Sequence, residues 1–297
     1  EDTSINLVID KANIARRTIK GSYKNDFKIY NENLENINER EKQLEKRMGP
    51  ALENGEFVPF LQPKFNLQTN TICGAEALAR WKAKDRMIAP FEFIPAFERN
   101  GFITKLDFSI YDQVFRFMSK MLKEGRTLFP ISLNVSRGHM SNPCFVEEVV
   151  ALLKTYEIPH ELVELEITES VFTEDKMLLK TFISEIRSYG MQVSIDDFGT
   201  AYSSLNLLKD VVVDVIKMDK SFIHDDVEDT EESIKSNKII VKNIVNMIKE
   251  LNFKIIFEGI ETKEHVEFLS GIGCRYGQGY VFARPMPLEE FKSTYLQ

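Results

Sequence analysis

The chain has 297 residues, enough for one large domain or for a domain with an appendage, and its 43% hydrophobic and 28% charged residues are ordinary for a globular protein. Its formal net charge of −8 argues against binding of DNA or RNA polymers through charge alone, although a small phosphate ligand stays open because bound metal ions reverse the local sign. Cys73, Cys144 and Cys274 are far apart, which argues against a disulfide framework and favours a reducing, cytoplasmic setting.

No apolar run approaches the roughly 18 residues of a membrane span, and no signal peptide is visible. The chain begins at Glu1 rather than at a methionine, so we expect a fragment of a longer protein. This expectation is compatible with a membrane anchor elsewhere in that parent protein.

Residues 1–53 show a helical pattern of apolar residues that differs from the pattern in the rest of the chain. Apolar side chains at helical spacing predict a first helix that ends before Gly21 and a second from about Asn31 to Leu52. The second helix carries a thin apolar seam, made of Leu34, Ile37, Leu44, Met48 and Leu52. The seam suits a helix packed on one neighbour or a short coiled coil, and a solvated linker helix is an equally good interpretation.

Strand-like and helix-like segments alternate from residue 57 onward. The predicted strands lie near 58–65, 71–79, 131–135, 163–168, 192–195, 213–217, 254–257 and 275–276. Helices are predicted near 90–99, 107–123, 144–156, 174–188, 231–251 and 263–270, and a last helix starts after Pro287. Strands and helices alternating over about 240 residues predict an α/β fold, a (β/α)8 TIM-type barrel that occupies residues 54–297 and follows the helical linker.

The first two strands are joined by residues 67–70 alone. A parallel crossover needs a dozen or more residues, so we expect these two strands to form an antiparallel hairpin. The barrel would then have an antiparallel first strand, which is a departure from the regular fold. The active site of such a barrel lies at the C-terminal edge of its parallel strands.

Six apolar segments each end in a carboxylate, an amide or a lysine. They are residues 75–80, 131–134, 163–169, 193–197, 215–219 and 255–258. Because the carboxyl ends of parallel strands meet at one edge, several acids should gather there, and crowded acids repel one another unless a cation lies between them. The pattern predicts a site for a hard metal ion.

Five of the strand-end side chains form an oxygen-rich set: Glu76, Asn134, Glu166, Asp196 and Asp197. Such ligands suit Mg²⁺ or Mn²⁺ rather than Zn²⁺. The adjacent Asp196 and Asp197 would let one carboxylate bridge two ions, and two ions about 3.5–4 Å apart clamp the attacking and leaving oxygens of a phosphoryl transfer. A lone acid at a strand end is more often a surface or capping residue, but chance would have to place all of these on one edge.

Three more residues are candidates from the pattern alone. Lys217 would orient a water or offset charge on a phosphate. Glu258 is a candidate general base, and Arg80 could hold a phosphate oxygen.

Glu76-Ala77-Leu78 with Arg80 resembles the signature of the EAL-domain family, the phosphodiesterases of the second messenger cyclic di-GMP. The resemblance extends over roughly residues 57–291, because further segments follow in family order and at family-like spacing. These are Gln62-Pro63, residues 93–95 with Glu98 and Gly101, and residues 133–136, 166–170, 196–200, 217–219, 258–262 and 278–280. The ordered set is far more specific than the triplet.

The resemblance implies a role for each matching position. It implies metal ligands at Glu76, Asn134, Glu166, Asp196 and Asp197. It implies that Glu258 is the catalytic base or a metal-linked acid, with Lys217 and Asp219 beside the attacking water. The dinucleotide would contact Gln62, Leu78 and Arg80, and Gln278 would complete the polar rim. Glu169 would brace the loop 197–205, which in this family links the active site to a dimer contact.

The implied activity is hydrolysis of one phosphodiester bond of cyclic di-GMP to linear pGpG, with two Mg²⁺ or Mn²⁺ ions and a homodimer as the expected assembly. The alternative is a non-catalytic cyclic di-GMP receptor, which the complete set of ligands disfavours. An unrelated metal-dependent barrel, such as an aldolase or lyase, would leave the ordered segments 196–205 and 258–262 unexplained.

Residues 12–30 resemble the closing helix and strand of a GGDEF domain, which often precedes an EAL domain. No diguanylate-cyclase signature is present, so we assign no activity to this part. A plain amphipathic helix is the competing interpretation.

Overall fold

The computed structural model describes residues 5, 8–9, 11–12, 29–169, 176–199, 208–209, 212–223 and 230–296. The GGDEF-like segment 12–30 and the loop 200–207 lie almost wholly outside this part of the chain. Two compact units are distinguished, the first made of Glu1–Glu56 and Trp81–Phe102, the second of Phe57–Arg80 and Ile103–Gln297.

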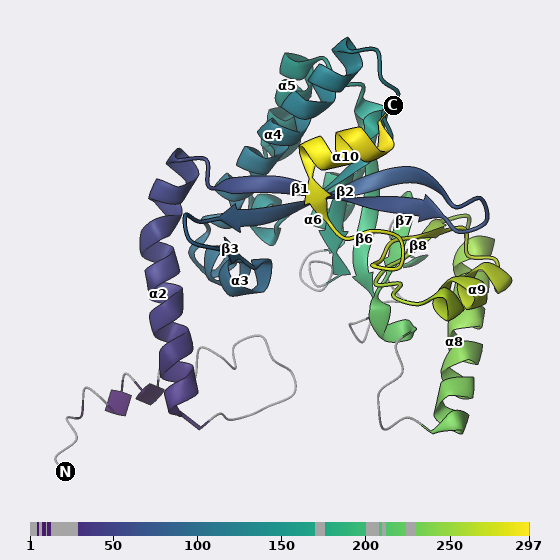
Figure 1. Ribbon diagram of the computed structural model, residues 1–297, viewed down its shortest axis with the longest axis horizontal. Coiled ribbons are helices and arrows are strands. Elements are labelled where there is room, and N and C mark those ends of the chain that lie inside the picture. Colours follow the sequence, from purple (N-terminus) through teal and green to yellow (C-terminus); the bar gives the residue numbers. More distant parts are fainter. Residues whose placement is uncertain are drawn as a thin grey trace. The chain divides into compact units, whose positions relative to one another are not determined.

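Among the described residues of the larger unit, eight strands close a barrel in the order β1, β9, β8, β7, β6, β5, β4, β2, and β2 returns to pair with β1 (Figure 1). Their bounds are β1 Phe57–Asn66, β2 Thr71–Lys82, β4 Ile131–Asn134, β5 Val163–Thr168, β6 Gln192–Phe198, β7 Val215–Met218, β8 Lys254–Phe257 and β9 Tyr276–Gly277. Neighbouring strands from β2 through β9 are parallel, whereas β1 runs antiparallel to β9. The predicted barrel with an antiparallel first strand is confirmed. A short strand, β10 (Met286–Pro287), pairs with β1.

The helices of this unit follow the predicted order. They are α4 Ile103–Lys123, α5 Phe145–Tyr156, α6 Lys176–Ser188, α8 Glu231–Glu250, α9 Lys263–Gly271 and α10 Leu288–Tyr295, with the short 3-10 helices η1 Arg137–Ser141, η2 His160–Leu162 and η4 Lys220–Phe222. Figure 1 shows α4 beside α5, and α4 also packs on β1. In α4, residues at helical spacing form one buried face, made of Leu106, Ile110, Val114 and Met118. Burial of this face holds the helix against the barrel.

The strands place polar side chains inside the barrel. Successive side chains of a strand point to opposite faces, so in β5 Glu164 and Glu166 share one face while Leu165 points to the other. Glu164 and Glu166 contact side chains from β1, and Glu166 also contacts β7, which identifies their face as the barrel interior. An acid two residues from a strand end is thus carried into the interior by alternation alone.

The smaller unit contains α2 (Glu32–Glu53), β3 (Met87–Ile88) and α3 (Pro90–Asn100). The predicted second helix is confirmed, and the Asn31 side chain caps it by accepting a hydrogen bond from Leu34 N at 3.0 Å. α2 packs on α3, with Leu34 and Leu44 buried and an ion pair between Arg40 and Glu92. Leu34 and Leu44 of the seam are therefore buried, whereas Ile37 is exposed.

Trp81 and Phe102 are buried in the smaller unit. The ring of Trp81 lies 5.7 Å from those of Phe93 and Phe97, centroid to centroid, and Phe102 packs on Phe97 at 5.0 Å. These aromatic side chains form its core.

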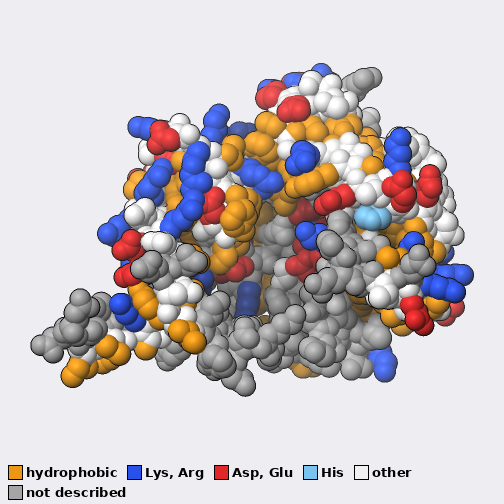
Figure 2. Space-filling model, turned by 60° about the horizontal axis from the view of Figure 1, so that its bottom comes forward, with side chains coloured by type: hydrophobic (Ala, Val, Ile, Leu, Met, Phe, Trp, Pro, Cys, Tyr) orange, Lys and Arg blue, Asp and Glu red, His pale blue; other side chains and the backbone are white. Residues whose placement is uncertain are grey.

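None of the helices in the described ranges offers the apolar length that crossing a bilayer requires. On the face that Figure 2 displays, basic, acidic and hydrophobic side chains are interspersed.

Candidate active site

Lys217 lies at the centre of the strand-end acids. β7 carries its ammonium group into the barrel, where the side chain has no solvent exposure. Its Nζ lies 2.6 Å from Glu166 Oε2, 2.7 Å from Glu258 Oε1, 3.0 Å from Asp196 Oδ1 and 3.3 Å from Glu76 Oε2. Burial acts to lower the pKa of Lys217, but the carboxylates, Asp196 foremost, raise it well above its ordinary value. The surrounding acids therefore favour the charged form of Lys217.

The acids around Lys217 fall into two electrostatic classes. Burial acts to raise the pKa of Glu166, but the ammonium groups of Lys217 and Lys64 outweigh it and lower that pKa to about 2. Burial dominates at Glu76 and Asp196 and raises their pKa values, and it raises the pKa of Glu258 well above its ordinary range. Glu166 is a fixed anion, whereas the other three release protons more readily when a cation is present.

Asp196, Asp197 and Glu258 bring one oxygen each to within 4.8 Å of one another. Adjacent residues of a regular strand point to opposite faces, which would separate Asp196 from Asp197. The backbone of Asp197 has φ 55°, in the left-handed region, and the pairing of β6 with β7 shifts register between Ile195 and Phe198. This bulge at the end of β6 brings both carboxylates to the same edge.

Two side-chain amides donate hydrogen bonds to Glu76, and a third amide accepts from one of them. Asn134 Nδ2 donates to Glu76 Oε1 at 3.2 Å, and Gln278 Nε2 donates to Glu76 Oε2 at 2.7 Å and to Gln62 Oε1 at 3.1 Å. Gln278 Oε1 is buried and has no hydrogen-bond partner in the described part of the chain. An unpartnered buried acceptor fits a site that receives a cation or a donor from a ligand.

Two further predicted residues act on the backbone nearby. Glu169 Oε2 accepts a hydrogen bond from Gly199 N at 2.8 Å, at the start of the loop that it is expected to brace. Asp219 Oδ1 accepts from Ser221 N at 2.8 Å and so caps η4. Burial is the largest cause of the raised pKa of Asp197, and the negative charge of Asp219 is the second largest. Asp219 is therefore close enough to interact electrostatically with these acids.

Leu78 and Arg80 follow Glu76 at alternate positions of β2 and so share its face. Arg80 Nη1 donates to Ala79 O at 2.9 Å, and its guanidinium carbon lies 5.6 Å from the centroid of the Phe60 ring. Both side chains are only half-buried, in contrast to Glu76.

The family model described as the EAL domain matches residues 45–285. The chain belongs to the EAL domain family. It is 32% identical over 293 residues to a cyclic di-GMP phosphodiesterase of Pseudomonas aeruginosa, covering 97% of this chain and 48% of that relative. It is 34% identical over 246 residues to the probable cyclic di-GMP phosphodiesterase PdeB of Escherichia coli, covering 82% and 46%.

A solved structure titled as a PaMucR phosphodiesterase in complex with c-di-GMP superimposes on this chain with a TM-score of 0.77 at 33% sequence identity. The match covers 84% of this chain and 99% of that one. The present chain spans about half or less of the length of the curated relatives that it matches.

The residues of this EAL domain fit a hard divalent cation. The three clustered acids offer only oxygen ligands, which Mg²⁺ and Mn²⁺ prefer. The connected network contains six carboxyl groups, those of Glu76, Glu164, Glu166, Asp196, Asp197 and Glu258. In the described part of the chain the ammonium groups of Lys64 and Lys217 form ion pairs with these acids, so this set carries an excess of four negative charges when every acid is ionised. A bound divalent cation would reduce that excess.

Three interior residues were not predicted from the sequence: Lys64, Ser132 and Glu164. Lys64 Nζ lies 2.9 Å from Glu166 Oε1 and 3.1 Å from Glu164 Oε1, and it also contacts Ser132. Their positions in the strands could have indicated two of them, because alternate residues of a strand share a face. Lys64 comes two residues after Gln62, and Glu164 comes two residues before Glu166.

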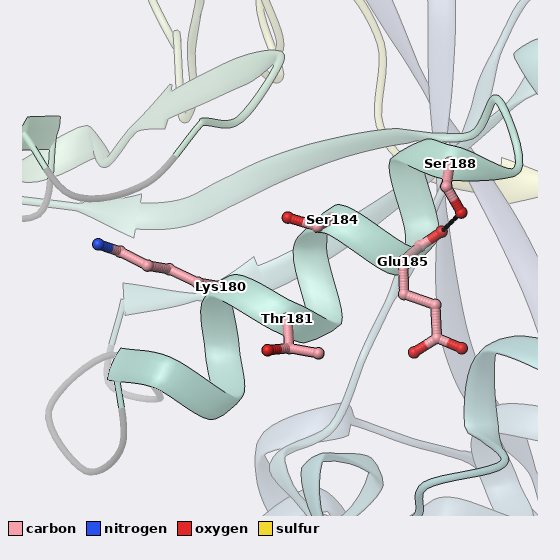
Figure 3. Close-up of a pocket in the computed structure, with 5 residues that line it drawn as sticks. All are labelled: Lys180, Thr181, Ser184, Glu185 and Ser188. Carbon is pink, nitrogen blue, oxygen red and sulfur yellow. Dashed lines mark hydrogen bonds between the residues drawn. The ribbon is translucent and has the colours of Figure 1, made fainter.

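A hollow of about 500 Å³ lies on α6, away from these acids. Figure 3 shows that its lining side chains all come from this one helix: Lys180, Thr181, Ser184, Glu185 and Ser188. The hydrogen bond drawn there, from Ser188 Oγ to Glu185 O at 2.7 Å, lies within the helix. These groups do not converge on a common point, so the strand-end acids remain the candidate site.

Proposed function

We propose that this EAL domain hydrolyses one phosphodiester bond of cyclic di-GMP to linear pGpG, with two Mg²⁺ or Mn²⁺ ions. The observation that carries the proposal is the approach of Asp196, Asp197 and Glu258 to within 4.8 Å of one another. The names of the relatives support the choice of substrate.

The acids supply the ligands in this proposal. Asp196, Asp197 and Glu258 would hold the cations, and Glu76, Asn134 and Glu166 would complete the set. When bound, two such ions lower the pKa of a water and stabilise charge on the attacking and leaving oxygens.

The remaining residues orient the reactants and move the proton. Glu258, whose pKa is raised well above its ordinary range, is suited to accept the proton of the attacking water or to act as a metal-linked acid. Lys217, a fixed ammonium, would stabilise negative charge on a phosphate oxygen beside that water, with Asp219 as its neighbour.

The half-buried side chains of β2 are accessible to a substrate. Arg80 would bind a phosphate oxygen, and Leu78, Gln62 and Gln278 would contact the dinucleotide. Glu169 would keep the loop that begins at Gly199 in place by holding its first amide.

Incubation of the chain with cyclic di-GMP and Mg²⁺ or Mn²⁺, followed by chromatography, tests the proposal. We expect metal-dependent pGpG from the wild type and none from Glu76→Ala or Asp196→Ala with the fold intact by circular dichroism. Normal turnover in either variant would overturn the ligand assignment. Binding without cleavage would favour the receptor, and neither binding nor cleavage would contradict the proposal.

A homodimer and a cytoplasmic setting complete the proposal, with 1–53 as a linker ahead of the catalytic domain at 54–297. Sedimentation velocity of the whole chain tests the dimer, since a single species at the monomer mass would contradict it.

A further inference from the structure

The barrel interior continues as a polar layer beyond the candidate metal ligands, towards the N-terminal ends of β4 and β5. Lys64, Ser132 and Glu164 line it, and each is at most 3% exposed. The interior of a TIM-type barrel is usually filled by layers of branched apolar side chains. Buried charges are costly unless every polar atom is paired, so a layer of this kind calls for a reason beyond packing.

Every donor of the Lys64 ammonium is engaged within this layer. Nζ donates to Glu166 Oε1 at 2.9 Å, to Glu164 Oε1 at 3.1 Å and to Ser132 Oγ. Ser132 Oγ in turn donates to Glu164 Oε1 at 2.9 Å. Side chains from β4 and β5 therefore fix the position of an ammonium group that β1 carries.

Glu166 is held from two sides by two different lysines. Its Oε1 accepts from Lys64, and its Oε2 accepts from Lys217 at 2.6 Å. Lys217 reaches Asp196 and Glu258 with the same ammonium group. A displacement of the Glu166 carboxylate would thus move Lys217 and the acids around it.

We propose that Lys64 is a positioning residue of the cation site. With Ser132 and Glu164 it fixes the Glu166 carboxylate and, through Glu166, the orientation of Lys217, without touching cation or substrate. The inference rests on the proposed metal-dependent function. Groups that hold a metal ligand from behind change metal affinity or activity by about 10–100-fold when they are removed.

The test compares the whole wild-type chain with two variants, Glu164→Gln and the double variant Lys64→Met/Glu164→Gln. The double variant removes one cation and one anion, so the net charge of the network is that of the wild type. The single variant keeps Lys64 but loses a negative charge. A purely electrostatic account predicts wild-type Mn²⁺ affinity for the double variant and weakened affinity for the single one. The positioning account predicts the reverse order.

Mn²⁺ titration calorimetry without substrate is the first readout. We expect the double variant to bind Mn²⁺ about tenfold or more weakly than the wild type, and Glu164→Gln to stay within about threefold. With saturating Mn²⁺, kcat of the double variant should fall by about tenfold or more while KM for cyclic di-GMP changes less than about twofold. The thermal midpoints should match, because a loss of packing alone would lower the midpoint instead.

A folded double variant with wild-type Mn²⁺ affinity and kcat overturns the inference but leaves the proposed function standing. A wild-type chain that neither binds Mn²⁺ nor cleaves cyclic di-GMP overturns both. Should the double variant fail to fold, Lys64→Gln/Glu164→Gln replaces it, with the same expected order of affinities and the same overturning result.

Discussion

Lys217 Nζ and Glu166 Oε2 lie 2.6 Å apart, and neither side chain is exposed to solvent. The pKa of Lys217 is raised well above its ordinary value, and that of Glu166 is lowered to about 2, so each group favours the charged form of the other. The pair joins the strand-end acids to the layer of Lys64, Ser132 and Glu164, because Lys64 and Lys217 bind opposite oxygens of the Glu166 carboxylate. Removal of Lys217 takes away the ammonium group that contacts Glu76, Asp196 and Glu258 and leaves those buried carboxyl groups without it.

Lys217→Met should therefore lower the free energy of unfolding of the metal-free chain by about 3–5 kcal/mol. Saturating Mn²⁺ should recover part of this loss, because a divalent cation compensates the same acids. Urea unfolding with and without Mn²⁺ measures both effects. Lys123→Met, at a 69% exposed side chain, is the matched control and should change stability by less than about 0.5 kcal/mol. Equal stability of the two variants would refute the role of Lys217.

Asp197, which we propose as a metal ligand, has a left-handed backbone, at φ 55°. Asn tolerates this conformation, so Asp197→Asn should fold with wild-type stability but bind Mn²⁺ more weakly and lose most of its turnover. Asp197→Val should lose a further 1–2 kcal/mol of stability, about the strain of a left-handed L-residue. Calorimetry and chemical unfolding of the two variants separate these effects. Equal stabilities would show that the conformation imposes no strain.

The barrel was predictable because its signals are local. Alternating strands and helices, the short connection at 67–70 and the polar strand ends each depend on neighbours in the sequence. These signals also placed Glu76 and Lys217 at one edge, where the structure joins them at 3.3 Å.

The parts that the sequence did not predict depend on contacts between distant residues. A lysine in a strand is usually exposed, and Lys64 is buried because Ser132 and Glu164, 68 and 100 positions away, satisfy its ammonium. Asp196 and Asp197 reach the same edge because of a bulge and a left-handed backbone at Asp197. An aspartate in the sequence only weakly predicts either feature.

The affinity for Mn²⁺ should rise with pH. Burial raises the pKa of Glu258 well above its ordinary range, so a cation that binds must displace a proton. In the metal-free chain this raised pKa stabilises the fold fully below the unfolded-state pKa, and the contribution is lost as pH rises through the folded-state pKa. Mn²⁺ should therefore raise the thermal midpoint more at about pH 8 than at about pH 6.

Calorimetry in two buffers of different ionisation enthalpy should detect the release of protons when Mn²⁺ binds, and Glu258→Gln should reduce that release. Affinity independent of pH would contradict the assignment.

Gly199→Ala should weaken both the fold and the activity. Gly199 has φ 98°, and a Cβ there would come within 2.1 Å of the Phe222 ring, so either that ring or the backbone that donates to Glu169 Oε2 must shift. We expect the free energy of unfolding to fall by about 2–4 kcal/mol from backbone strain and overpacking, with reduced turnover.

Gly125→Ala is the control, since its φ of 73° is also positive but nothing lies within 4 Å of its added Cβ. Its free energy of unfolding should fall by only about 1–2 kcal/mol. Thermal unfolding and turnover are measured for both. Equal losses would mean that the contact with Phe222 is unimportant and that left-handed strain alone explains the effect.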